Sequence, residues 1–230
     1  MKIKNLVYAR LTLFLICGFI LSCNKDKPPS DHPKTVIDID GNVYATVLIG
    51  NQIWMATNLN TTKYNDGSTI PELANSDDWY NATAGGWCAY NNESTNISTY
   101  GRLYNWYAVK TGLLAPKGWR VPTIDDWKTL ELFLGESSLA GGKLKEAGFG
   151  HWFSPNVSAT NESGFNALPG GNRTSTSAFY SINYTGYWWT ATKGSDNAYA
   201  RYCFLDFNSG FLLNDEDYVS DGMSVRCIKE

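Results

Sequence analysis

The stretch Pro122-Thr123-Ile124-Asp125-Asp126-Trp127 is the clearest structural signal in this 230-residue chain, and it predicts the start of a helix. Thr123 can accept a hydrogen bond from the first turn, and Asp126 can return one, as in a capping box. Asp125 and Asp126 also suit the positive end of the helix dipole. Gly135 is the expected end of the helix. Apolar residues at helical spacing predict one buried face: Ile124, Trp127, Leu130 and Phe133.

Strand-like segments lie on both sides of this helix. Before it, Asp40-Gly41 and Gly50-Asn51 separate three segments at 36–39, 43–49 and 52–57, which predicts an antiparallel meander. Strands are also expected after it, at 186–192, 199–206, 211–213 and 223–228. Further short helices are expected before it, near 103–110, and after it, near 138–147. This order predicts an α+β fold with antiparallel sheets, two or three short helices and long loops, in which the first and last strands share a sheet. The longest predicted loop covers 60–99.

Composition excludes several classes of protein. Charged residues make up 18% of the chain and aromatic residues 14%, whereas disordered chains are rich in charge and poor in aromatic residues. The chain lacks the long runs of Ala, Glu, Lys and Leu that a coiled coil requires. The net charge of −3 argues against a nucleic-acid partner. Many aromatic, Asn, Gly, Ser and Thr residues are typical of a loop-rich extracellular domain.

The N-terminus predicts export and lipid anchoring. Three basic residues, Lys2, Lys4 and Arg10, precede an apolar run at 11–22, which is too short to span a bilayer (about 20 residues) but fits a signal peptide. The run ends at Leu21-Ser22-Cys23, which resembles the lipobox of bacterial lipoproteins. We therefore expect a lipoprotein signal peptide at 1–22 and acylation of Cys23. A plain secretory signal with an incidental cysteine is the alternative.

Residues 23–35 are polar and contain three prolines, so they predict a lipidated tether ahead of one domain at 36–230. Residues 1–22 carry three basic and no acidic side chains, so their removal would change the net charge from −3 to −6. The expected location is the bacterial cell envelope, with the lipid anchored in the outer membrane and exposure at the cell surface left open.

The cysteines and histidines limit the chemistry. Cys17 lies in the signal peptide, and an oxidising compartment favours pairing of two of the three domain cysteines, which are Cys88, Cys203 and Cys227. His32 lies in the tether, so His151 is the only histidine in the domain. A His-based zinc site or a Ser-His-Asp triad would depend on that one residue. We interpret His151, beside Trp152, as ordinary packing.

Six motifs follow one another along the chain: DIDGNVY at 38–44, IGNQIWMATNL at 49–59, YGRLYNWYAV at 100–109, PKGWRVPTIDDW at 116–127, NALPGGNR at 166–173 and SVRC at 224–227. As a set they resemble the Fibrobacter succinogenes major paralogous domain and cover about residues 36–229. The resemblance implies a C-type-lectin-like fold. It also implies a secreted protein or lipoprotein of the Fibrobacter or Bacteroidetes type, which agrees with the N-terminus.

The same resemblance implies a disulfide between Cys88 and Cys227, which would join the loop at 60–99 to the last strand; Cys203–Cys227 is the alternative. A more distant likeness is to formylglycine-generating enzymes, which carry a similar Arg-Leu-Pro-Thr…Trp stretch. Those enzymes need two redox cysteines close together late in the chain. Here Cys203 stands alone until Cys227, which argues against that activity.

Tyrosines in the less patterned segments predict a binding surface at 176–184 and 196–221. Exposed Tyr with Asn, Ser and Gly forms adaptable binding surfaces, and adjacent strand residues face opposite sides, so one of Trp188 and Trp189 can also reach a surface. The candidate binding residues are Tyr180, Tyr184, Tyr199 and Tyr218.

Calcium is the one cofactor considered. Asp215 and Asp217 lie in an acidic stretch at 214–221 that we expect to form a loop with oxygen ligands, and a solvated loop is the alternative. The Glu-Pro-Asn, Gln-Pro-Asp and Trp-Asn-Asp motifs of calcium-dependent lectins are absent from the sequence. No catalytic residue and no other metal site is predicted.

The sequence therefore favours a non-enzymatic envelope lipoprotein. Its expected role is to bind or adhere to an extracellular glycan or protein, and its partners would also include the membrane, through the N-terminal lipid. An envelope enzyme, either a formylglycine-type oxidase or a carboxylate hydrolase, is one alternative. A structural envelope protein without a specific ligand is the other.

Overall fold

The structure, a computed structural model, describes residues 32–230. The predicted signal peptide at 1–22, the acylation site Cys23 and the tether as far as residue 31 lie outside the described residues.

The predicted meander forms one end of a five-stranded sheet with the order β1-β2-β3-β13-β6. All its pairings are antiparallel, and Ile228 of the last strand lies opposite Trp54. The first and last strands of the domain thus share a sheet, as predicted. Its strands are β1 (Thr35–Ile37), β2 (Val43–Ile49), β3 (Gln52–Met55), β6 (Trp119–Arg120) and β13 (Ile228–Lys229).

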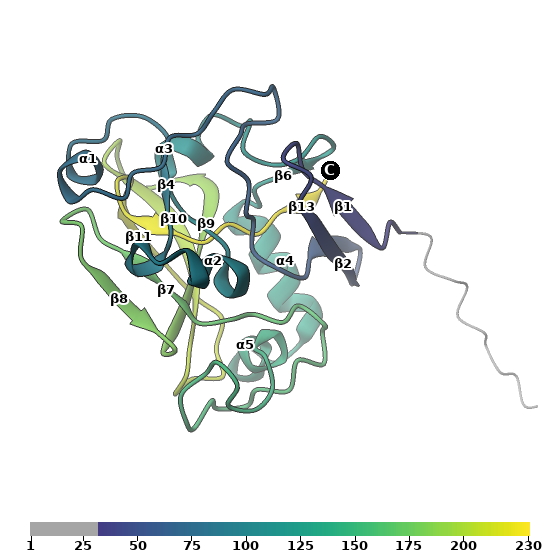
Figure 1. The fold of residues 1–230 in the computed structure, drawn as a ribbon. Coiled ribbons are helices and arrows are strands. Elements are labelled where there is room, and N and C mark those ends of the chain that lie inside the picture. The colour runs from purple at the N-terminus through teal and green to yellow at the C-terminus, as the bar shows by residue number, and fades with distance from the viewer. Residues whose placement is uncertain (1–31) are drawn as a thin grey trace, which may run out of the picture. The chain divides into compact units, whose positions relative to one another are not determined.

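A larger sheet has the order β11-β10-β9-β7-β12-β5-β4, with β8 paired to β7 (Figure 1). Its longest strands, β9 and β10, form an antiparallel pair, and the β7–β9 pairing is parallel. Its strands are β4 (Trp87–Cys88), β5 (Leu103–Asn105), β7 (Gly170–Arg173), β8 (Phe179–Ile182), β9 (Thr185–Lys193), β10 (Tyr199–Asp206), β11 (Leu213–Tyr218) and β12 (Gly222–Met223).

The central helix, α4 (Ile124–Leu134), begins as predicted. The Thr123 side chain accepts from the backbone of Asp126, whose carboxylate accepts from the backbone of Thr123, so the capping box is complete. The expected buried face is only partly correct. Leu134, rather than Phe133, is buried with Trp127 and Leu130, and 63% of Phe133 is exposed. Phe133 instead lies over the tight turn at Gly50.

The segment at 60–99 is more ordered than the predicted loop. It contains α1 (Ser76–Tyr80), β4, a 3₁₀ turn η1 (Tyr90–Asn92) and the start of α2 (Ser94–Tyr100). Asn75 caps α1 by accepting from the backbone of Asp77. With α3 (Trp106–Val109), α4 and α5 (Ser137–Leu144), the described residues contain five short α-helices, so the expectation of two or three was too low. The two that the sequence did not predict, α1 and α2, are one or two turns long and carry little apolar periodicity, so the sequence gives no signal for them.

The core is unusually aromatic and divides into three clusters. Trp188 packs with Trp54 and Trp127 in one cluster, while Trp189 packs with Tyr104 in another. Both Trp188 and Trp189 are fully buried, so neither reaches a surface as the sequence suggested. The reason is that β9 is an inner strand whose two faces are both covered. Cys88 belongs to the third cluster.

Buried cations contribute to this core. Arg226 is 1% exposed and has no ion-pair partner among the described residues. Its guanidinium donates to Asn58 Oδ1 at 2.7 and 3.1 Å and lies 4.2 Å from the ring centre of Phe165. Burial lowers its pKa to about 9. Polar and π contacts thus replace the water that the charge loses.

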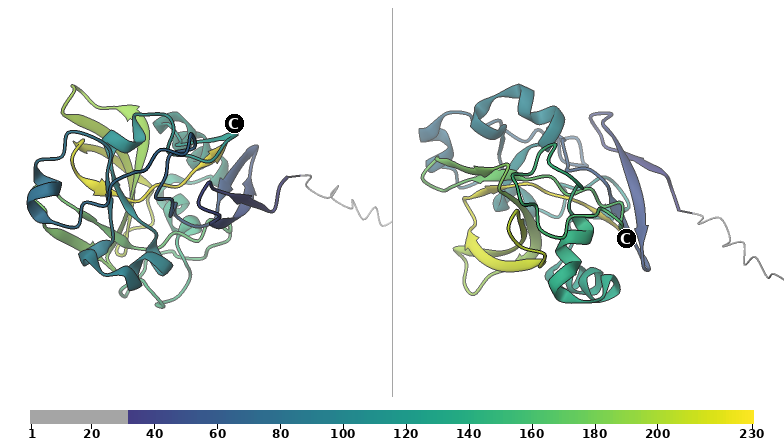
Figure 2. Two further views of the ribbon diagram at one scale, coloured as in Figure 1. Left: turned by 45° about the horizontal axis from the view of Figure 1, so that its top comes forward. Right: turned by 90° about the horizontal axis from the view of Figure 1, so that it is seen from below.

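The described domain is α+β with mainly antiparallel sheets, which confirms the predicted fold class. Among residues 32–230, no helix combines the length and the apolar composition that crossing a membrane requires. Figure 2 shows that β8 and the β1–β2 hairpin lie on opposite sides of this domain.

Candidate functional site

The four predicted binding tyrosines do not form one surface. Tyr184 lies opposite Phe207 at one end of the β9–β10 pair, and Tyr199 lies opposite Gly194 at the other. About ten residues of strand separate these ends, which corresponds to about 30 Å. The predicted face at 176–184 and 196–221 is therefore two surfaces, because the strands between them run the length of the sheet.

Tyr199 and Tyr218 form the first group. They are partners across β10 and β11, and their rings stack with centroids 4.9 Å apart. Tyr218 is 47% exposed and Tyr199 is half-buried. Each ring thus covers one face of the other.

Tyr184 belongs to a second group, which also includes residues that the sequence did not single out. Its ring stacks on Phe153 at 4.5 Å with an interplanar angle of 9°. Phe153 forms one wall of a hollow of about 270 Å³, which Phe149, His151 and Asn183 also line. Tyr184 does not line the hollow, but its ring stacks on Phe153, which does, and we call Phe149, His151, Phe153, Asn183 and Tyr184 the aromatic hollow. Tyr180, four residues earlier on β8, is exposed and is not part of this group.

The rings of the aromatic hollow are open to solvent. Phe149 is 65% exposed, Phe153 50% and Tyr184 41%. Exposed apolar rings gathered around a depression mark interaction sites more often than isolated ones do. The volume is close to the lower end of small-ligand sites, about 300–1,000 Å³.

Polar groups of the aromatic hollow are held in fixed positions. His151 Nδ1 lies 2.9 Å from both carboxylate oxygens of Glu146. Because an ionised carboxylate only accepts, Nδ1 carries the proton and Nε2 is left for a ligand. Beneath them, the Tyr100 hydroxyl donates to Asn183 Oδ1 at 3.2 Å, and its ring meets His151 edge to face. The Asn183 amide nitrogen has no partner among the described residues, so it can donate to a ligand.

The loop that carries these residues is pinned from below. Trp152 is buried and its indole N–H donates to the carbonyl of Ala167 at 3.0 Å. The Asn156 amide donates to the carbonyls of Glu146 and Gly148. The Phe153 N–H donates to the carbonyl of Asn183 at 2.8 Å, which joins the two halves of the site. A site held in this way loses little conformational freedom when a ligand binds.

The interpretation of His151 as ordinary packing was incomplete. Trp152 is indeed core, but Phe149, His151 and Phe153 surround it and face outward. The sequence signal was the run Phe149-Gly-His-Trp-Phe153, which places four rings in a segment without helical or strand periodicity. Their convergence with Asn183 and Tyr184, some thirty residues later, could not be inferred from that run.

The acidic stretch is not a loop. Asp215 and Asp217 belong to β11, where they lie opposite Tyr202 and Ala200 of β10. Residues 32–230 contain no group of three or more His, Cys, Asp or Glu side chains placed to hold a metal ion. The calcium candidates therefore have no third ligand of these types, because strand pairing spreads the acidic side chains along the sheet.

One acid near this strand has unusual electrostatics. Asp221 is 3% exposed, and its carboxylate accepts from the backbone N–H of Ser175 at 2.7 Å. Burial and the neighbouring Asp217 carboxylate raise the pKa of Asp221 to about 7. Both causes disfavour the charged form.

The expected disulfide is absent. Cys88, Cys203 and Cys227 are all free and buried, so neither Cys88–Cys227 nor Cys203–Cys227 is formed. The physical reason is their placement, since each cysteine belongs to a different hydrophobic cluster. Burial raises the pKa of each thiol, to about 12 for Cys88, which keeps the three groups protonated and unreactive.

Comparison with known proteins gives one match. The family model described as the Fibrobacter succinogenes major domain matches residues 47–229. The comparisons with curated proteins and with solved structures gave no match. The match contains five of the six sequence motifs in whole, and the residues of the aromatic hollow lie within it. Because it covers well over half of the chain, this protein belongs to the Fibrobacter succinogenes major domain family.

Proposed function

We propose that this protein is a lipid-anchored, non-enzymatic binding module of the bacterial cell envelope, and that the aromatic hollow binds an extracellular glycan. One observation carries the proposal. Exposed, co-stacked rings of Phe153 and Tyr184 stand beside fixed hydrogen-bonding groups of His151 and Asn183.

This combination suits the chemistry of a sugar. A pyranose ring presents an apolar C–H face, which packs on an aromatic ring, and a rim of hydroxyl groups, which need hydrogen-bond partners. In the aromatic hollow, Phe149 and the free face of the Phe153–Tyr184 stack supply apolar surface. His151 Nε2 and the Asn183 amide supply the polar contacts. The small volume favours a terminal sugar unit over the interior of a long chain.

The rest of the proposal rests on the sequence. Acylation of Cys23 would hold the domain in the outer membrane, where an extracellular ligand is accessible. A C-type-lectin-like architecture, implied by the family resemblance, is part of the proposal, and the two mainly antiparallel sheets with peripheral short helices support it. A protein ligand that inserts an apolar side chain into the aromatic hollow is the alternative occupant.

A glycan array probed with the domain, followed by calorimetry on the best ligand, tests the site. Tyr184→Ala and Phe153→Ala should each weaken binding about tenfold, because each removes a stacking surface worth roughly 1 kcal/mol beyond its buried area. Tyr199→Ala is the matched control, since it opens an equally stacked tyrosine pair at the other end of the sheet. EDTA should leave the affinity unchanged.

Three results would contradict the proposal. Loss of binding in Tyr199→Ala but not in Tyr184→Ala would move the site to the other end of the sheet. Retained binding in both Tyr184→Ala and Phe153→Ala, with unchanged melting temperatures, would exclude the aromatic hollow. Binding to proteins on a parallel protein array, without binding to any glycan, would mean that the ligand is a protein rather than a glycan.

A further inference from the structure

The β1–β2 hairpin exposes an apolar patch. Ile37 and Val43 lie directly opposite each other, so their side chains share a face, and they are 60% and 61% exposed. Ile39, which follows β1, is 46% exposed. On the other face of the hairpin, Val36 and Tyr44 pack against the core. We call Ile37, Ile39 and Val43 the hairpin patch.

The charges around the hairpin patch are unevenly distributed. Asp38 is buried, and its carboxylate accepts from Tyr44 and from the backbone and side chain of Asn42. Asp40 pairs with Lys63 at 3.2 Å. Both acids of the hairpin are thus engaged within the protein.

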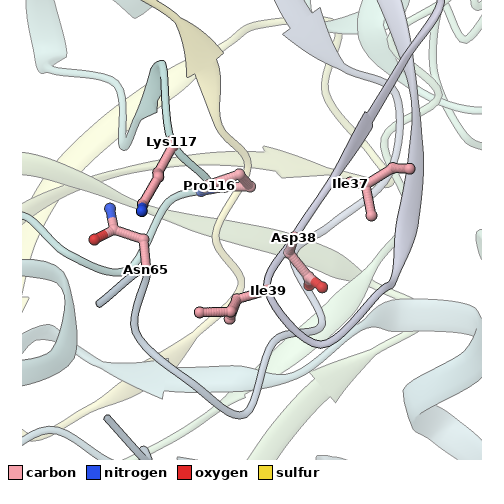
Figure 3. A pocket seen from close by; sticks show the side chains of 6 residues that line it. All are labelled: Ile37, Asp38, Ile39, Asn65, Pro116 and Lys117. Atoms are coloured by element: carbon pink, nitrogen blue, oxygen red, sulfur yellow. The ribbon is translucent and has the colours of Figure 1, made fainter. Parts of the chain in front are cut away.

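A lysine at its rim is not engaged. Lys117 is exposed and has no acidic partner among the described residues, and the same holds for Lys34, which directly precedes β1. Figure 3 shows Lys117 and Ile39 reaching toward a hollow of about 240 Å³ that Pro116 and Asn65 also line. The outward surface is therefore apolar with a cationic rim, which is the pattern of segments that bind at lipid interfaces.

The position of the hairpin in the chain also favours contact with a lipid interface. Thr46 donates through its backbone N–H to the carbonyl of Lys34 and through its hydroxyl to that of Pro33, so the chain enters the domain along the hairpin. Cys23 precedes Thr35 by only twelve residues, which span at most about 40 Å. Of all surfaces of the domain, the one at this entry point is held nearest to the anchored end.

We propose that the hairpin patch contacts the membrane to which the protein is anchored, at the boundary between headgroups and acyl chains. The inference rests on the lipid anchoring of the proposed function and adds a second, weaker attachment to it. A patch of three side chains is too small to hold a protein by itself, but it orients one that is already tethered. Because β8 lies on the opposite side of the domain, this orientation turns β8 toward the outside (Figures 1 and 2).

An environment-sensitive fluorophore tests the contact on the full, lipidated protein. Val43→Cys is labelled with NBD, and the protein is reconstituted into vesicles of phosphatidylethanolamine and phosphatidylglycerol. The three native domain thiols are buried and will not react, and Cys23 is acylated in the proposed form. Tyr180→Cys, with 56% of the native side chain exposed on β8, is the matched control. Flotation of the vesicles reports anchoring independently.

The expected result is a blue shift and nitroxide-lipid quenching of the label at 43, with neither effect at 180. Ile37→Asp in the Val43→Cys protein should reduce the quenching by at least half, because it places a charge within the contact. Flotation without a blue shift at 43 would overturn the membrane contact and leave the anchoring intact. Failure to float would overturn both. A blue shift that appears without lipid and grows with protein concentration would assign the hairpin patch to a second copy of the chain.

Discussion

The substitution Asp221→Asn tests the electrostatic reasoning most directly. Asp221 is 3% exposed, and burial together with the Asp217 carboxylate raises its pKa from the ordinary value of 3.8 to about 7. Between these two values the folded protein keeps a proton that the unfolded chain releases. Stability must therefore fall as the pH rises from about 4 to about 7, and it levels off above 7.

The magnitude follows from the same two values. A tenfold change in proton affinity corresponds to 1.36 kcal/mol, so the ionised Asp221 costs up to about 4 kcal/mol above pH 7. Asparagine removes the charge. It keeps an oxygen that can accept from the backbone N–H of Ser175, which in the native protein lies 2.7 Å from the Asp221 carboxylate. The variant should match the native protein near pH 4 and be more stable by up to about 4 kcal/mol at pH 8.

Urea titrations between pH 4 and pH 8 measure this difference. The quantity of interest is the free energy of unfolding of the variant minus that of the native protein. In this difference, the pH-dependent contributions of all other acidic groups cancel. Asp215→Asn, at an exposed position of strand β11, is the control and should show little pH dependence. A difference between Asp221→Asn and the native protein that stays constant across this range would refute the reasoning.

The remaining predictions concern local contacts. Thr123→Ala should lower the free energy of unfolding by about 1 kcal/mol, because it removes the side-chain acceptor of the α4 capping box; Thr123→Ser should restore most of it, and thermal denaturation measures both. The three domain thiols, Cys88, Cys203 and Cys227, should react with a thiol reagent only after denaturation, with three equivalents released per domain. If fewer than three thiols react in the unfolded, non-reduced protein, two of the cysteines are joined in a disulfide after all.

Local signals were sufficient for the framework of the fold. The capping box at Thr123 and Asp126, the turns at Asp40-Gly41 and Gly50-Asn51, and the apolar strands between them depend on residues a few positions apart. Such patterns act through the backbone of the same element, so the sequence displays them. The pairing of the last strand with the first sheet also followed from the order of elements.

Predictions of buried side chains from the sequence were wrong where burial depends on which other segments cover a helix or strand. Phe133 and Leu134 both continue an apolar helix, and the position of the Gly50 turn decides which of them is buried. Trp188 and Trp189 face opposite sides of β9, yet both are buried because both sides are covered. The cysteines follow the same rule, since separate clusters keep them apart.

The sequence by itself determined the α+β class, the capped helix, the aromatic core and the family motifs. Only the tertiary structure decided which aromatic residues form a site. Phe153 and Tyr184 are thirty-one residues apart, and a backbone hydrogen bond from Phe153 to Asn183 brings their rings together. It likewise decided that the two tyrosine groups stand about 30 Å apart, because the length of β9 and β10 separates them. Periodicity and capping depend on sequence neighbours, whereas a binding surface depends on contacts between distant segments.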